Sequence, residues 1–133
     1  MDFIRAGRAF TITGRDFGPP HLWFVLTDPD LSKVVIVSVV TPRPHTDKTT
    51  TLRPKDHHFL QHDSNVDYGG AKFFPVSKLQ SAIEDGRCLL QPDMDPELLR
   101  LVRRGLLMSP RTVHAIADFC SRVFPDDCLP QQT

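Results

Sequence analysis

The fold is decided by one stretch, Val34-Val35-Ile36-Val37-Ser38-Val39-Val40. Such a short run of β-branched apolar residues is typical of a strand that is buried on both faces. A second apolar run over residues 22–26 precedes it, and Asp28-Pro29-Asp30 between the two favours a turn. The two runs are therefore predicted to be central strands joined by a hairpin.

Further strands are expected on either side of these two. Residues 8–13 alternate polar and apolar side chains and end at Gly14 and the Gly18-Pro19-Pro20 cluster. Another strand is predicted over residues 71–74, and Gly69-Gly70 before it permits a bulge or a close backbone approach. Residues 41–55 hold three prolines and several charges, which predicts a surface loop without a core.

The second half of the chain has helical periodicity. Residues 76–86 predict a short helix, and Asp95-Pro96 predicts the start of another that ends at Gly105. Ser109-Pro110 repeats the start signal. The apolar stripe that follows it is predicted to be core rather than a binding face. The sum is an α+β fold, a small, strongly bent antiparallel sheet of the SH3-like barrel type with C-terminal helices.

Size and composition limit the classes of protein that fit. With 133 residues, 40% of them hydrophobic and 24% charged, we expect one domain over residues 1–124 and a loose tail over 125–133. Sixteen basic and sixteen acidic residues cancel, which argues against a strong non-specific nucleic-acid binder. No apolar run reaches the roughly 20 residues of a membrane helix. The start of the chain does not read as a signal peptide, so a cytoplasmic location is expected.

Several motifs together resemble the PemK/MazF-like toxins of toxin–antitoxin systems. The similarity spans residues 7–107. It rests on Gly7-Arg8-Ala9-Phe10, His21-Leu22-Trp23-Phe24-Val25-Leu26-Thr27, the Val34 to Thr41 stretch, Asp63-Ser64-Asn65-Val66 through Lys72 to Leu79, and the leucines at 98, 99 and 106.

This resemblance implies an SH3-like barrel, usually a homodimer, that cleaves single-stranded RNA without a metal or other cofactor. It also implies an antitoxin partner whose disordered tail covers the RNA groove. The family's catalytic pair is an Arg at the start of the second strand and a Thr at the end of the third. Thr41 matches the Thr, but His21 stands at the Arg position and Leu22 replaces the Pro that follows it. An altered ribonuclease, an inactive relative and a silent interaction module on the same barrel all remain open.

The residues themselves could carry metal-free RNA cleavage. The reaction needs a base for the 2′-hydroxyl proton, an acid for the leaving 5′-oxygen and donors for the phosphate charge. Histidine suits both proton transfers, since its ordinary pKa is about 6.5. His21 would lie close to Thr41 if their strands pair, and Thr41 could donate to a phosphate oxygen. Equally, His21 fits a strand edge and Thr41 a strand end without any function.

The crowded stretch Asp56-His57-His58, with His62 and Ser64 shortly after it, offers a second group of candidates. His57 or a neighbouring histidine would transfer protons, and Ser64 would donate a hydrogen bond to the substrate. Adjacent residues of an extended segment point to opposite sides, so His57 and His58 should not act together. A zinc site and a simple hydrogen-bonded turn are the alternatives. Zinc is disfavoured, because the His58-x-x-x-His62 spacing lies on no helical pattern and lacks the metalloprotease Glu.

Four further residues are candidates for RNA contacts. Lys72 falls where the resemblance implies a basic residue beside the RNA, and Arg43 and Lys55 decorate the long loop. Tyr68 could stack on a base. Each has an ordinary alternative as a solvated side chain, or as a core residue in the case of an aromatic ring.

Overall fold

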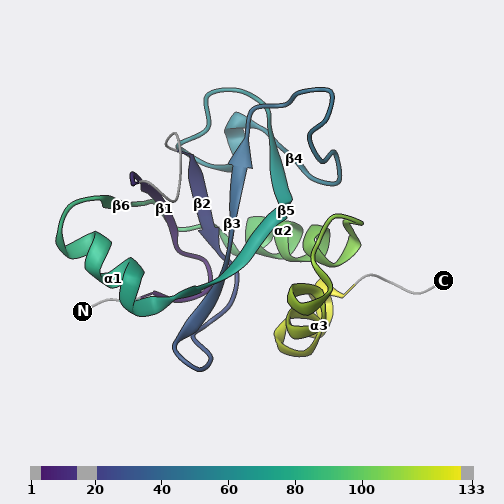
Figure 1. Cartoon of the computed structure of the whole chain (residues 1–133). Helices are drawn as coiled ribbons and strands as arrows, with labels where there is room; N and C mark the ends of the chain where they lie inside the picture. Colours follow the sequence, from purple (N-terminus) through teal and green to yellow (C-terminus); the bar gives the residue numbers. More distant parts are fainter. Residues whose placement is uncertain (1–3, 15–20, 130–133) are drawn as a thin grey trace.

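The computed structural model describes residues 4–14 and 21–129, and within them the chain forms an α+β fold (Figure 1). Its strands make one six-stranded antiparallel sheet in the order β4-β5-β3-β2-β1-β6. The strands are β1 Ala9–Ile12, β2 Leu22–Val25, β3 Lys33–Val40, β4 Thr51–Leu52, β5 Ser64–Pro75 and β6 Cys88–Gln91. The Gly18-Pro19-Pro20 cluster lies outside the described residues.

Strand β3 is the centre of the sheet, as its sequence predicts. Every residue from Val34 to Val39 is buried, because both faces of the strand are covered. Val35, Val37 and Val39 belong to one apolar cluster, whereas Val34 and Ile36 belong to another on the opposite face. Strand β2 pairs with β3 and is likewise buried throughout.

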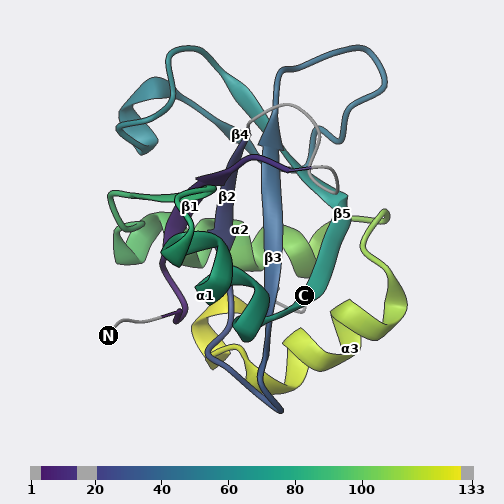
Figure 2. The same ribbon diagram turned by 60° about the vertical axis from the view of Figure 1, so that its left-hand side comes forward.

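The helices cover these two faces separately. The three helices are α1 Val76–Glu84, α2 Pro96–Met108 and α3 His114–Val123, with single 3₁₀ turns at Pro54–Asp56 and Asp126–Cys128. Figure 2 shows α1 in front of the strands and α2 behind them. Leu79 of α1 belongs to the cluster of Val34, and Val102 of α2 to that of Val35. The sheet is therefore the middle layer.

The helix boundaries depart from the sequence prediction at two points. Asp95 caps α2 as expected, accepting a hydrogen bond from the Leu98 N–H at 2.9 Å. Gly105, however, does not end the helix, which runs on to Met108. Ser109-Pro110 does not start the next one either, since α3 begins at His114. Gly105 is instead a packing glycine, because a Cβ there would lie 2.1 Å from the Tyr68 hydroxyl oxygen.

Strand β5 is much longer than the predicted 71–74. It begins at Ser64, so the polar residues that read as a loop belong to a strand paired with β3 and β4. The pairing of β5 with β3 is irregular at Gly69-Gly70, which the two glycines permit: Ile36 pairs with Lys72 and Ser38 with Asp67, so Val37 alone faces residues 68–71. Alternation fails as a signal here because the irregularity interrupts it.

Three other expectations are corrected. The 41–55 segment is not a loop without a core, since Asp47, Thr50 and Leu52 are buried and β4 lies within it. Strand β6 was not predicted. Residues 125–129 are not loose, because Cys128 is buried and the Arg104 guanidinium donates to the Asp127 carbonyl at 2.7 Å; residues 130–133 lie outside the described part. No helix in the described residues is long and apolar enough to cross a membrane.

Candidate active-site groove

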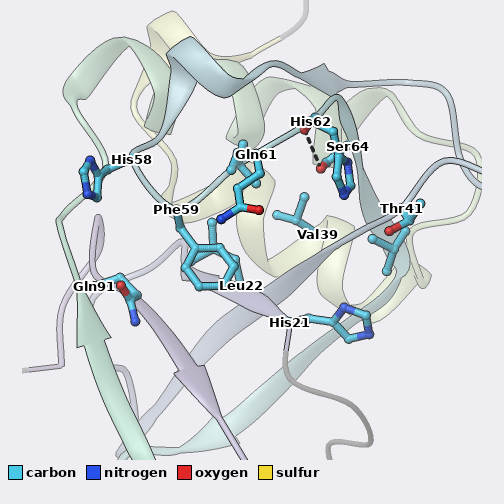
Figure 3. A pocket seen from close by; sticks show the side chains of 12 residues that line it. His21, Leu22, Val39, Thr41, His58, Phe59, Gln61, His62, Ser64 and Gln91 are labelled. Carbon is cyan, nitrogen blue, oxygen red and sulfur yellow. Dashed lines mark hydrogen bonds between the residues drawn. The ribbon is translucent and has the colours of Figure 1, made fainter.

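Two adjoining pockets form a groove at one end of β2 and β3. The first, the imidazole pocket, has a volume of about 470 Å³, and the second, the arginine pocket, about 400 Å³. They share His21, Val40 and Thr41, so they adjoin at these three residues. Figure 3 shows His21, Thr41, His62 and Ser64 toward one side of the imidazole pocket, with His58 and Gln91 toward the other.

His21 and Thr41 are brought together, as their predicted strand pairing requires. Strands β2 and β3 are antiparallel, with Trp23 opposite Ser38. Continuing this register places the residue before β2 beside the end of β3. Both residues line both pockets, and Thr41 is exposed while His21 is half-buried. They therefore lie at the junction of the groove.

His57 is not part of the groove. Its side chain is only 5% exposed, and its ring packs against Phe24 with centroids 5.9 Å apart. A backbone carbonyl can only accept, so Nε2 donates to the Pro92 oxygen at 2.7 Å, and Nδ1 accepts from the Phe59 N–H at 3.0 Å. Both nitrogens are used in holding the turn, and the prediction of His57 as a catalytic residue is corrected to a structural role.

His58 and His62 lie in the imidazole pocket instead. The Nδ1 of His62 lies 2.8 Å from the Asp63 carbonyl oxygen and must donate to it. In the neutral ring this fixes the proton on Nδ1 and leaves the Nε2 lone pair able to accept a proton. Ser64 also lines the pocket, though it is buried and its hydroxyl donates to the His62 carbonyl at 3.2 Å. Ser64 thus supports the turn that carries His62.

The predicted RNA contacts divide sharply. Arg43 lines the arginine pocket and is exposed. Tyr68 is fully buried, with its hydroxyl 2.8 Å from Thr50 Oγ1 and 2.9 Å from the Val102 carbonyl, and burial raises its pKa. It cannot stack on a base. Lys72 lies over the Trp23 ring, 5.3 Å from the centroid, and lines neither pocket of the groove; Lys55 is exposed on the 3₁₀ turn, also outside them.

The long loop is anchored on α2 by buried polar groups, which the sequence prediction missed. Asp47 accepts from the Ser109 hydroxyl at 2.6 Å and from the Thr49 N–H at 2.8 Å. Burial is the largest influence and would raise the pKa of Asp47, but the hydrogen bonds from Ser109 and Thr49, together with the positive charge of Arg111, hold it below its ordinary value. The Tyr68 hydroxyl forms a hydrogen bond with Thr50 Oγ1 beside Gly105. These contacts fix the wall of the arginine pocket.

Arg111 and His45 are lining residues of the arginine pocket that the sequence did not single out. Arg111 stands between α2 and α3, beyond the segment that resembles the toxins, so no motif pointed to it. The described residues contain no group of three or more His, Cys, Asp or Glu side chains that could hold a metal ion. The chain matches no family model, and no curated protein matches its sequence.

Proposed function

We propose that the protein is a metal-independent endoribonuclease of the PemK/MazF-like type, acting on single-stranded RNA on an SH3-like barrel. The observation that carries the proposal is that His21, Thr41 and His62 line one pocket, and that His21 and Thr41 also line an adjoining pocket with two arginines. RNA cleavage without a metal requires proton-transfer groups and phosphate-binding groups near one another.

The proposed reaction uses two imidazoles. His62 takes the 2′-hydroxyl proton at Nε2, and the 2′-oxygen attacks the adjacent phosphorus. The bond from phosphorus to the 5′-oxygen breaks as His21, in its protonated form, gives that oxygen a proton. The products are a 2′,3′-cyclic phosphate and a 5′-hydroxyl. Thr41, exposed beside His21, donates a hydrogen bond to a phosphate oxygen as negative charge develops there.

Histidine in place of the family's arginine changes what this position supplies. An arginine is always charged and can only stabilise the phosphate, whereas a histidine can also deliver a proton. The proposal therefore accounts for the departure at residue 21 as altered chemistry rather than loss of activity. A homodimeric state and neutralisation by an antitoxin belong to the same proposal.

Purified protein incubated with a mixed RNA substrate, with and without EDTA, tests the proposal. We expect cleavage at some pH between about 5 and 9, the range that spans ordinary histidine titration. Fragments should end in 2′,3′-cyclic phosphate, and a 2′-O-methyl oligonucleotide of the same sequence should stay intact. Absence of cleavage over that whole range would favour the silent interaction module. Cleavage that EDTA abolishes would favour a metal-dependent hydrolase.

A further inference from the structure

The arginine pocket brings together two arginines that no described carboxylate holds in an ion pair. Within the described part of the chain, Arg5, Arg8, Arg53, Arg87 and Arg100 each pair with a carboxylate. Neither Arg43 nor Arg111 forms an ion pair with any described residue. Two histidines, His21 and His45, line the same pocket. The guanidinium groups of Arg43 and Arg111 can therefore bind an anion from solution, although Arg111 also attracts the Asp47 carboxylate electrostatically.

Arg111 is held in place before any ligand arrives. Its guanidinium donates to the His45 carbonyl at 2.7 Å, and its backbone N–H donates to the Ser109 hydroxyl oxygen at 3.1 Å. Ser109 is itself fixed by the buried Asp47. A side chain ordered in advance loses less conformational freedom when it binds a ligand. Arg111 is thus a preorganised donor on a rigid support.

Arg43 lies on a turn that closes on itself. The Arg43 N–H donates to the Thr46 hydroxyl at 3.0 Å, and the Lys48 ammonium donates to the Thr46 carbonyl at 3.0 Å. Lys48 therefore stabilises the turn that contains Arg43. Among the described residues, Asp67 is the one carboxylate residue that lines the arginine pocket. It lies over Gly70, where a Cβ would be 2.7 Å from Asp67 Oδ2, and it is outnumbered by the two arginines.

We propose that the arginine pocket is a subsite for a second, non-scissile phosphate of the RNA, with Arg111 as its principal contact and Arg43 as the rim contact. The proposal rests on the proposed function, because the RNA strand must continue from His21 and Thr41 into this pocket. Phosphate is the expected anion, since guanidinium forks match its oxygens. The subsite sets the register of the strand rather than taking part in proton transfer.

The test is binding of an uncleavable 2′-O-methyl oligonucleotide at a series of salt concentrations. Arg111→Ala should weaken binding about tenfold at low salt, the loss expected for one charge-assisted contact. The slope of log affinity against log salt should shrink by about 0.7, the value for one phosphate contact on a single strand. Arg111→Gln keeps a donor for the His45 carbonyl without the charge and should show the same change in slope.

Arg122→Ala is the matched control, because Arg122 is exposed on α3 and outside the groove. It should leave the slope unchanged. Equal slopes for the Arg111 and Arg122 variants, or a full slope in Arg111→Gln, would overturn the subsite. An Arg111-dependent affinity for an acidic peptide, with none for RNA, would overturn it in favour of a protein partner. A protein that binds RNA in this way but does not cleave it would contradict only the proposed function, because the binding measurement needs no reaction.

Discussion

His57 and His58 are adjacent in the chain yet belong to two regions with opposite physical properties. His57 is buried, and both its ring nitrogens are hydrogen-bonded to the backbone. His58 is exposed and lines the imidazole pocket. A histidine whose ring nitrogens both have hydrogen-bond partners within the protein stabilises a turn. A histidine that is exposed in a pocket can bind a substrate, although the residue type is the same.

The segment that contains His57 and the groove differ in the same way. In the anchored segment, residues 47–57, the buried Asp47, Thr50 and His57 all have hydrogen-bond partners within the protein. In the groove, Thr41 and His62 remain exposed. A buried polar group costs stability unless it is paired, so removing a partner in the anchored segment should lower the unfolding free energy, whereas removing a groove side chain should hardly change it.

Gly105→Ala should give the largest stability effect. The added Cβ would lie 2.1 Å from the Tyr68 hydroxyl oxygen and 2.2 Å from Thr50 Oγ1. To relieve this overlap, α2 would have to move away from the anchored segment. Overpacking and broken buried hydrogen bonds outweigh the gain in helix propensity, and we expect a loss of about 3 kcal/mol in unfolding free energy.

Denaturant unfolding of Gly105→Ala beside Gly69→Ala measures this effect. Gly69 is exposed, and a Cβ there would have its nearest neighbour at an ordinary 3.6 Å. The control should change stability by less than about 0.5 kcal/mol. Similar losses for the two variants would show that the close approach at Gly105 is not what anchors the segment.

The adjacent histidines provide the next test. His57→Ala should lower the unfolding free energy by about 2 kcal/mol, because the Pro92 carbonyl and the Phe59 N–H lose a buried partner. His58→Ala should leave the unfolding free energy within about 0.5 kcal/mol of the wild type. Chemical denaturation of both variants measures the difference, and equal stabilities would contradict the division into two regions.

Asp47 should contribute the smallest effect, and one that depends on pH. Because its folded pKa is below its unfolded value, its stabilisation is complete above the unfolded pKa and is lost as pH falls through the folded pKa. Asp47→Asn should therefore cost about 1 kcal/mol at neutral pH and less below about pH 4. Unfolding curves at pH 7 and at acid pH measure this; a difference that grows on acidification would reverse the assigned sign.

Much of the fold follows from the sequence because burial leaves a local signature. The β3 run, the Asp95 cap and the Gly69-Gly70 pair all correspond to elements of the structure. Strand β6 and the continuation of α2 through Gly105 depend on partners far away in the chain. β6 pairs with β1, and Gly105 accommodates Tyr68. Neither contact has a local pattern.

The sequence predicts the position of site residues only where two neighbouring strands bring them together. His21 and Thr41 meet because β2 and β3 are antiparallel neighbours. The directions of the His57, His58 and His62 side chains depend on the turn that contains them. Arg111 lies in the groove because the segment after α2 packs beside it. Tyr68 reads as a candidate for base stacking because residues 64–70 have no clear strand pattern, whereas the structure buries it within β5.

The most direct test of the central claim, that the groove histidines cleave RNA, compares His21→Ala with His114→Ala in EDTA. His114 is exposed at the start of α3, outside the groove, so its variant removes an equivalent imidazole without touching the site. We expect His21→Ala to lower the cleavage rate by about a hundredfold or more, and His114→Ala to match the wild type. Equal rates for the two folded variants would contradict it.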